Sequence, residues 1–537
     1  MYYTIVSGCC QESYFVSSER DKQGGSAIQQ KKGVVSLKYT STRDEAKSVS
    51  AAQAISQGIS GEGGLFVPCE LPHYSYEDLT ELSKCSYEER AVRILKDFLT
   101  DFSETEIREC VVNAYGGNKF SGGHPAPLTL QQNGELNMYM LELWHGPTCA
   151  FKDMALQILP HLLTKSLEKI HSDKTAVILV ATSGDTGKAA LEGFKDVDGT
   201  RVLVFYPENG VSPMQKLQMN TQEGSNVAVC AIEGNFDDAQ TGVKKIFTNE
   251  AVRAQLEARN MMFSSANSIN WGRLLPQIVY HISAYCDLMA TGEMDYEGEE
   301  INIVVPTGNF GNILAAYYAK QMGLPVHKLI CASNANNVLT DFLRTGVYDR
   351  NRPFHTTISP SMDILVSSNL ERLLYHLTNG NSQKVSEWMQ QLSETGRYEV
   401  DEDIKRTLQE LFWAGFCDDE ATKNTVHEMF SVENYLIDPH TAVAANVYKQ
   451  YVGNTGDVKT PTVVVSTASP YKFPGDVLSA VTGEEQPGDE FQQIMQLAFI
   501  TGTPVPPPIG ELQGKEIRFE NHCRPDGMTE AVLAMVR

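Results

Sequence analysis

The sequence predicts an α/β protein that is built from two parallel β-sheets with helices on both faces. Short runs rich in Val, Ile, Leu and Ala alternate with helical stretches, and such uninterrupted apolar runs are typical of parallel strands that are buried on both faces. The expected strands are Asn137–Leu143, Thr175–Ala181, Arg201–Tyr206, Asn226–Ile232, Ile301–Pro306, Lys328–Ser333 and Thr462–Ser466. A chain of 537 residues is long enough for about three or four compact units.

Three further segments have a different character. Residues 1–37 mix Ser, Gln, Gly and Lys with little periodicity, which indicates a poorly ordered N-terminal extension. Residues 38–136 contain stretches such as Ser48–Gln57 and Tyr87–Phe98, whose apolar residues have helical spacing, so we expect a helical N-terminal domain there. Residues 370–430 are mostly helical and polar, which predicts a helical insertion before the final strand.

The composition limits the partners of the protein. Lys and Arg total 44 against 67 for Asp and Glu, and the formal charge of −23 repels nucleic acid and anionic membrane surfaces. The 11 cysteines include no C-x-x-C pair, which fits a reducing compartment better than a disulfide framework or a zinc site, so no metal is expected. No apolar run approaches the roughly 20 residues of a membrane span, and residues 1–32 lack a secretory signal. The predicted location is the cytoplasm.

The loop after the expected strand Ile301–Pro306 is suited to bind a phosphate group. It has the sequence PTGNFGN at residues 306–312 and leads into a helix. Its two glycines allow successive N–H groups to point at one spot, and the N-terminus of the helix adds a positive partial charge. The loop matches neither the dinucleotide-binding fingerprint nor the P-loop. A turn that only caps the helix is the alternative interpretation.

A lysine follows the first expected strand in an apolar setting. The segment LWHGPTCAFKD at residues 143–153 places Lys152 near the start of a helix. Desolvation and the helix dipole both lower the pKa of an ammonium in such a place, and a partly neutral lysine is a nucleophile toward an aldehyde. The commoner alternative is a lysine that extends into solvent.

Three more segments offer hydrogen-bond donors. TSGDTGK at 182–188 presents hydroxyls, N–H groups and the Lys188 cation to a carboxylate, or only caps a helix. SSANSINWGR at 264–273 gathers donors for a second phosphate, or consists of capping residues and a surface arginine. The Thr467 hydroxyl follows a buried strand, where it could bond a ring nitrogen or close a turn. Together with Lys152 and the glycine loop, these donors predict a pyridoxal phosphate site with room for an acidic substrate.

These motifs resemble those of the threonine synthase family of the long, bacterial and fungal type, from about Leu37 to Phe473. The matching blocks are SGDTG at 183–187, YPENGVSPMQKLQM at 206–219, GNFDDAQ at 234–240, NSINWGR at 267–273, PTGNFGN at 306–312, SPSMDILVSSNLER at 359–372, DPHTAVA at 438–444 and STASPYKFP at 466–474. The resemblance implies fold type II of the pyridoxal phosphate enzymes, which is the tryptophan synthase β-like fold. It further implies a small mobile α/β domain at 174–260 and a large cofactor-binding domain formed by 137–173 and 261–537.

The resemblance also implies a role for each matching residue. Lys152 would be the catalytic residue, which holds the cofactor as a Schiff base and transfers protons of the substrate. Gly308, Asn309, Phe310, Gly311 and Asn312 would hold the cofactor phosphate, and Thr467 would bond the pyridine nitrogen. Thr182, Ser183 and Thr186 would meet the substrate carboxylate and neighbouring groups, while Asn267, Ser268 and Arg273 would meet the substrate phosphate. Asp185 would lie beside the 3′-oxygen of the cofactor, where a shared proton or a nearby cation is needed to avoid repulsion between like charges, and Lys188 is the residue expected to supply the cation.

The implied reaction converts O-phospho-L-homoserine and water to L-threonine and phosphate, the last step of threonine biosynthesis, in a monomer or homodimer. One alternative is a pyridoxal phosphate lyase of the serine or threonine dehydratase type, whose substrates have no γ-phosphate for Arg273 to bind. Another is a non-catalytic homologue that binds a phosphorylated metabolite.

Overall fold

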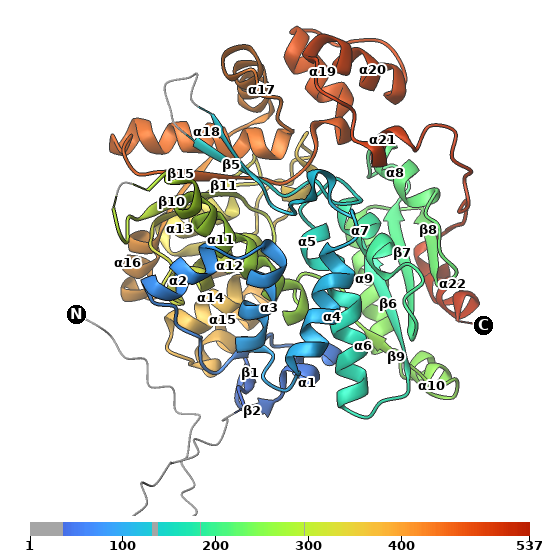
Figure 1. The fold of residues 1–537 in the computed structure, drawn as a ribbon. Helices are drawn as coiled ribbons and strands as arrows, with labels where there is room; N and C mark the ends of the chain where they lie inside the picture. Colours follow the sequence, from blue (N-terminus) through green and yellow to red (C-terminus); the bar gives the residue numbers. More distant parts are fainter. Residues whose placement is uncertain (1–35, 132–137, 183, 295, 537) are drawn as a thin grey trace, which may run out of the picture.

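The computed structural model describes residues 36–131, 138–182, 184–294 and 296–536 (Figure 1). The expected poorly ordered extension therefore lies outside the described residues, except for Ser36 and Leu37, and so does the predicted site residue Ser183. The described residues form two sheets of mainly parallel strands with helices on both faces, which confirms the predicted α/β class. None of their helices is long and apolar enough to span a membrane.

The larger sheet consists of β4 (Leu128–Gln131), β5 (Met138–Glu142), β10 (Ile301–Pro306), β11 (Val326–Ser333), β14 (Phe412–Phe416) and β15 (Thr462–Ser466). Its order is β14-β11-β10-β15-β5-β4, and only β4 runs antiparallel to its neighbour. Around it lie α11 (Trp271–Thr291), α12 (Gly311–Gln321), α13 (Val338–Thr345) and α18 (Pro439–Thr455). Ile303 and Val305 join the core that includes α11 and α12, whereas Val304 joins the core that includes α18. Both faces of β10 are thus buried, which explains its continuous apolar sequence.

The second sheet consists of β6 (Thr175–Ala181), β7 (Thr200–Pro207), β8 (Val227–Ile232), β9 (Met261–Ser264) and β16 (His522–Cys523). Its order is β16-β8-β7-β6-β9, and all pairs are parallel. The helices near it are α6 (Leu159–Lys169), α7 (Asp185–Phe194), α8 (Pro213–Asn220), α9 (Phe236–Thr248), α10 (Glu250–Glu257) and α22 (Met528–Met535). Val177 and Leu179 of β6 face a core with α9 and α22, while Ile178 and Val180 face the main core.

The C-terminal residues pack on the second sheet, which corrects the expected division of the chain. That division assigned all of 261–537 to the larger domain, but β9 and β16 are strands of the second sheet, and Met528 and Val532 of α22 belong to its core. Figure 1 shows the chain leaving α19 (Pro474–Thr482), α20 (Glu490–Thr501) and α21 (Pro507–Gly510) and ending beside β8. A two-residue edge strand leaves no periodicity in a sequence, so the pattern could not predict this return.

The N-terminal region contains the expected helices together with unexpected strands. Its helices are α1 (Ala51–Gln57), α2 (Tyr76–Ser83), α3 (Tyr87–Phe98) and α4 (Glu104–Tyr115). Each begins with a capping box on the preceding serine, which satisfies two backbone donors at the helix start. The unexpected strands β1 (Tyr39–Ser41), β2 (Asp44–Val49) and β3 (Phe66–Pro68) form an antiparallel sheet, and β4 joins the larger sheet.

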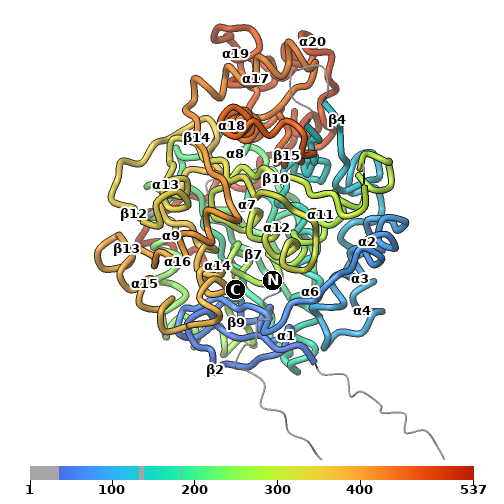
Figure 2. Tube along the Cα trace, turned by 90° about the vertical axis from the view of Figure 1, so that its left-hand side faces the viewer, coloured from blue at the N-terminus to red at the C-terminus, as the bar shows by residue number. Residues whose placement is uncertain are grey.

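The expected helical insertion contains α14 (Leu370–Leu377), α15 (Ser382–Thr395), α16 (Glu402–Leu411) and α17 (Asp419–Glu433). It is not wholly helical, because β13 (Arg397–Glu399) pairs with β12 (Val347–Asp349) and β14 forms an edge of the larger sheet. In both views α17, α19 and α20 lie together at one end of the molecule (Figures 1 and 2).

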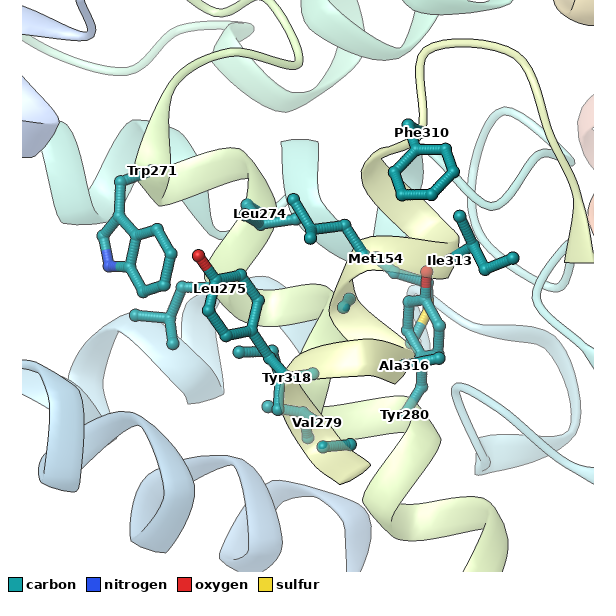
Figure 3. Packing of buried hydrophobic residues seen from close by; sticks show 14 of the residues in the cluster. Met154, Trp271, Leu274, Leu275, Val279, Tyr280, Phe310, Ile313, Ala316 and Tyr318 are labelled. Carbon is teal, nitrogen blue, oxygen red and sulfur yellow. The ribbon is translucent and has the colours of Figure 1, made fainter. Parts of the chain in front are cut away.

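The main core fixes α12, whose N-terminus follows the glycine loop. The Trp271 ring of α11 lies 5.6 Å from the Tyr318 ring of α12, edge to face, and 5.5 Å from the Tyr39 ring. Figure 3 shows Trp271 and Tyr318 in this core, with Phe310 and Ile313 at the start of α12. Because these side chains are buried and closely packed, the loop before α12 is attached to a rigid support.

Candidate active site

Lys152 lies where the loops after two neighbouring strands meet. It directly precedes α5 (Asp153–Leu156) on the loop after β5, and Thr467 lies on the loop after β15. The Phe151 N–H donates to the Thr467 carbonyl oxygen at 2.8 Å, and the Ser469 N–H donates to the Cys149 carbonyl oxygen at 3.0 Å. The strands are parallel, so both loops leave the edge of the sheet at which α/β proteins bind ligands. The structure thereby brings the predicted residues Lys152 and Thr467 together.

The Lys152 amine is buried and weakly held. The residue is 8% exposed, and its Nζ donates to Ser361 Oγ at 3.2 Å and lies 3.7 Å from Asp185 Oδ2. Burial lowers the pKa of Lys152 to about 8, although the Asp185 carboxylate opposes this shift. An amine with this pKa is partly neutral near neutral pH, so it can attack a carbonyl carbon or accept a proton.

Asp185 is the charged centre of the site. Its Oδ1 forms an ion pair with Lys472 Nζ at 2.9 Å and accepts a hydrogen bond from Gln215 Nε2 at 3.0 Å, and its Oδ2 accepts one from Ser361 Oγ at 3.2 Å. Burial alone would raise the pKa of Asp185, but Lys472 and then Lys152 hold it well below its usual value. Asp185 is therefore an ionised carboxylate between two buried lysines.

The cation beside Asp185 is Lys472 and not Lys188, which corrects the expectation from the sequence. Lys188 Nζ donates to Glu192 Oε2 at 2.9 Å and to Gln222. Glu192 lies one helical turn after Lys188, so the two side chains pair along α7 and the ammonium does not reach Asp185. Lys472 ends the 3₁₀ turn Pro470–Lys472, and its pairing with α7 exists only in the folded chain. The one signal in the sequence was its place within the matching block 466–474.

The N–H groups of the glycine loop have no partner within the described residues. Gly308 and Asn309 have carbonyl oxygens that accept bonds from the Ser367 hydroxyl at 2.8 Å and from the Asn369 amide side chain at 3.0 Å. Among the described residues, no acceptor binds the N–H groups of residues 308–312. Phe310 has a φ of 60°, which turns the chain into α12. The loop is therefore an anion cradle at a helix N-terminus.

The loop before α7 has a more structural role than the sequence suggested. The Thr182 hydroxyl accepts bonds from the N–H groups of Gly184 at 3.0 Å and Gly187 at 2.9 Å, so it shapes its own loop. Gly184 has a φ of 136°, a backbone conformation that side chains other than glycine rarely adopt. The Thr186 hydroxyl has no hydrogen-bond partner within the described part of the chain and remains able to bind a ligand.

A second group of anion donors lies next to the glycine loop. Arg273 is 3% exposed and donates to the Ala266 carbonyl oxygen at 2.6 Å, but it meets no carboxylate of the described residues within 4.0 Å, and its Nε has no partner there. Burial lowers the pKa of Arg273 to about 10, so the guanidinium stays charged. Ser268 reaches the glycine loop through Ser368, whose hydroxyl is 3.4 Å from the Ser268 hydroxyl and donates to Asn309 Oδ1 at 3.2 Å.

Three predicted residues retain unused polar groups in this region. The Asn312 side-chain NH₂ is buried without a partner, and the described residues offer none to the Asn267 side chain. The Thr467 hydroxyl also has no partner there, although the residue is only 5% exposed. Such groups are costly to bury unless a ligand binds them. No cluster of three or more possible metal-binding side chains occurs within the ranges that the structure describes.

Three family models match consecutive parts of the chain. They describe the threonine synthase N terminus at residues 38–115, a pyridoxal-phosphate dependent enzyme at 121–403 and the threonine synthase C-terminal region at 441–523. Threonine synthase-like 1 of Macaca fascicularis is 40% identical over 84% of this chain, which corresponds to 61% of that protein. The chain thus spans about three fifths of the length of that relative.

Bacterial relatives match over nearly their whole length. Threonine synthase of Pseudomonas aeruginosa is 37% identical over 83% of this chain and 91% of that protein. The crystal structure of pyridoxal-phosphate-bound threonine synthase from Brucella melitensis superposes with a TM-score of 0.81 and 35% identity, covering 94% of this chain and 100% of that one. These matches confirm fold type II and the resemblance seen in the motifs. The chain belongs to the threonine synthase family of pyridoxal-phosphate-dependent enzymes.

Proposed function

We propose that the protein is a threonine synthase, which converts O-phospho-L-homoserine and water to L-threonine and phosphate. The observation that carries this proposal is the buried Arg273 guanidinium, which meets no carboxylate of the described residues and lies close enough to Lys152 to lower the pKa of that amine. The cradle at 308–312 is a separate group of donors. A pyridoxal phosphate enzyme needs one phosphate site for its cofactor, and a second one is useful only if the substrate is also phosphorylated.

The residues of the site fit the cofactor. Its phosphate matches the unpaired N–H groups of Gly308, Asn309, Phe310, Gly311 and Asn312. The cofactor aldehyde matches the Lys152 amine, and the ring nitrogen matches the Thr467 hydroxyl, which has no partner among the described residues. The 3′-oxygen matches the donors that surround Asp185, which are the Ser361 hydroxyl and the Lys472 ammonium. When bound, pyridoxal phosphate supplies an electron sink that stabilises negative charge on the α-carbon of the substrate.

Lys152 has the properties of the general base in this reaction. Its amine is partly neutral, so it can take the α-proton of the substrate, then the β-proton, and later return a proton to the α-carbon. Ser361 binds Lys152 Nζ and Asp185 Oδ2 at once, which orients the amine within the site. A single base thus serves several proton transfers, and its burial keeps bulk water away from the amine.

The remaining donors bind the two anionic ends of the substrate. Arg273 holds the phosphate with Asn267 and Ser268, and it stabilises the charge that collects on the phosphate as it leaves the γ-carbon. Thr186 binds the substrate carboxylate, and the family resemblance assigns Thr182 and Ser183 to the same end of the substrate. The ammonium of the predicted substrate-binding residue Lys188 is paired with Glu192 within α7.

Incubation of the purified protein with O-phospho-L-homoserine and pyridoxal phosphate tests the proposal. Threonine and phosphate that appear in equal amounts support it, and 2-oxobutyrate indicates the dehydratase alternative instead. A protein that binds O-phospho-L-homoserine without turnover indicates the non-catalytic alternative.

We also propose a cytoplasmic enzyme that acts as a monomer or homodimer. Support for the compartment comes from the nine cysteines of the described residues, all of which are free thiols. Fractionation of cells and sedimentation of the purified protein test both statements.

A further inference from the structure

The Lys472 side chain is held as an ammonium by three acceptors. The residue is fully buried, and its Nζ forms an ion pair with Asp185 Oδ1 at 2.9 Å and donates to the Thr148 carbonyl oxygen at 2.9 Å and to Gln218 Oε1 at 3.2 Å. A neutral amine has two N–H groups, whereas an ammonium has three. The three acceptors therefore match the charged form of Lys472.

Lys152 is bound quite differently to the same carboxylate. Its Nζ reaches Ser361 Oγ at 3.2 Å, but Asp185 Oδ2 is 3.7 Å away, beyond a normal hydrogen bond. One carboxylate thus faces two lysines, and the closer contact goes to Lys472. If Lys472 were absent, the full charge of Asp185 would be available to hold the proton on Lys152.

We propose that Lys472 is a positioning residue for Lys152: it binds the Asp185 carboxylate permanently and so prevents this carboxylate from holding the proton on the Lys152 amine. The same turn that follows Thr467 delivers this cation, because Lys472 N–H donates to the Ser469 carbonyl oxygen at 3.1 Å. The inference rests on the proposed role of Lys152 in the reaction. It adds the reason why an acidic side chain can lie beside a lysine that must lose its proton.

The other charged groups around Lys152 do not compensate for Lys472. They are Arg273 of α11, His440 of α18 and Asp153 of α5. Asp153 is occupied by the N–H and hydroxyl of Thr148, at 2.8 and 2.7 Å. His440 accepts the Ser361 N–H on Nε2 and lies 2.7 Å from Asp438 on Nδ1, so its ring binds the backbone of Ser361 and not Lys152.

The test measures the amine directly in the full chain after removal of the cofactor. Trace acetylation with acetic anhydride at a series of pH values, followed by mass spectrometry of the peptide with Lys152, gives the pH midpoint at which this amine becomes reactive. In Lys472→Gln the midpoint is expected to rise by about one unit or more, because Asp185 then acts on Lys152 alone. In the double variant Asp185→Asn with Lys472→Gln, the midpoint is expected to fall below that of the unmodified chain, since burial remains and the carboxylate is gone.

The midpoint of Lys152 is thus expected to rise in the single variant and to fall in the double variant. A merely structural role of Lys472 would shift the midpoint in the same direction in both variants. Lys195→Gln is the matched control, since it removes a lysine at the C-terminal end of α7 that pairs with Glu223 at 2.8 Å, and the Lys152 midpoint should not change. If Lys472→Gln fails to fold, Lys472→Met gives the same comparison. An unchanged or lower midpoint in the single variant overturns the inference. A raised midpoint in a protein that forms no threonine retains it and removes the proposed reaction instead.

Discussion

Replacing Gly308 by alanine should damage the phosphate cradle in a measurable way. A Cβ atom at this position would lie 2.9 Å from the Ser361 carbonyl oxygen and 3.2 Å from Met362 Cα. Carbon and oxygen normally stay about 3.3 Å or more apart, and both neighbours are backbone atoms that cannot rotate away. The loop at 306–312 must therefore move from the segment that carries Ser361.

The size of the effect follows from these contacts. Forcing an extra carbon into a packed site typically costs about 1–3 kcal/mol of folding stability. Displacement of the loop also costs one or two hydrogen bonds to the cofactor phosphate, each about 1.5–3 kcal/mol, so pyridoxal phosphate should bind at least about tenfold more weakly.

Gly311 provides the matched control. A Cβ atom there would be 3.6 Å from Asn369 Nδ2 and 3.7 Å from Gln277 Nε2, which are ordinary contacts. Alanine at this first position of α12 should leave the stability of the cofactor-free chain unchanged or slightly higher. Urea unfolding measures the stability of each variant, and absorbance titration with pyridoxal phosphate measures its affinity for the cofactor. Equal stability of the two variants, or full cofactor affinity in Gly308→Ala, would refute the reasoning.

Three other predictions concern charge and backbone geometry. Burial lowers the pKa of Lys152 to about 8 in the folded chain, but not in the unfolded chain. The cofactor-free variant Lys152→Met should therefore be more stable than the unmodified chain below pH 8, by up to about 3 kcal/mol, and this advantage should vanish as the pH rises to 10.5. A stability difference that stays constant in urea unfolding across this pH range would disprove the prediction. Arg273→Ala should raise KM for O-phospho-L-homoserine by at least about tenfold and leave the affinity for pyridoxal phosphate unchanged. A loss of cofactor affinity would contradict this and would show that Arg273 binds the cofactor phosphate instead of the substrate phosphate. Gly184→Ala should lower the free energy of unfolding by about 1–3 kcal/mol, because φ at this position is 136° and an added Cβ atom would overlap the Gln215 side chain. Calorimetry tests this, and an unchanged melting temperature would contradict it.

The parallel sheets could be predicted because their strands are buried on both faces. β6, β10 and β15 occupy the residues expected from their apolar runs. The short strands β1, β3 and β16 were missed, since strands of two or three residues show no periodicity. They gain their pairing from contacts that are distant in the sequence.

The site was predictable where its chemistry is local. A glycine loop before a helix and a lysine after a strand are recognisable as such, and the structure places Lys152 and Thr467 side by side. The prediction that Lys188 pairs with Asp185 was wrong. Lys188 is close to Asp185 in sequence but pairs with Glu192, whereas Lys472, which does pair with Asp185, lies in a turn that is distant in the sequence. The internal bonding of the Thr182 hydroxyl was likewise invisible before the loop was seen folded.

The most direct test of the account is the identity of the amine that binds the cofactor aldehyde. The protein is mixed with pyridoxal phosphate, reduced with borohydride and digested, and the labelled peptide is identified by mass spectrometry. The account predicts a pyridoxyl group on Lys152, and none on any residue of Lys152→Ala. A label on Lys472 or another lysine of the unmodified chain, or no label at all, would contradict it.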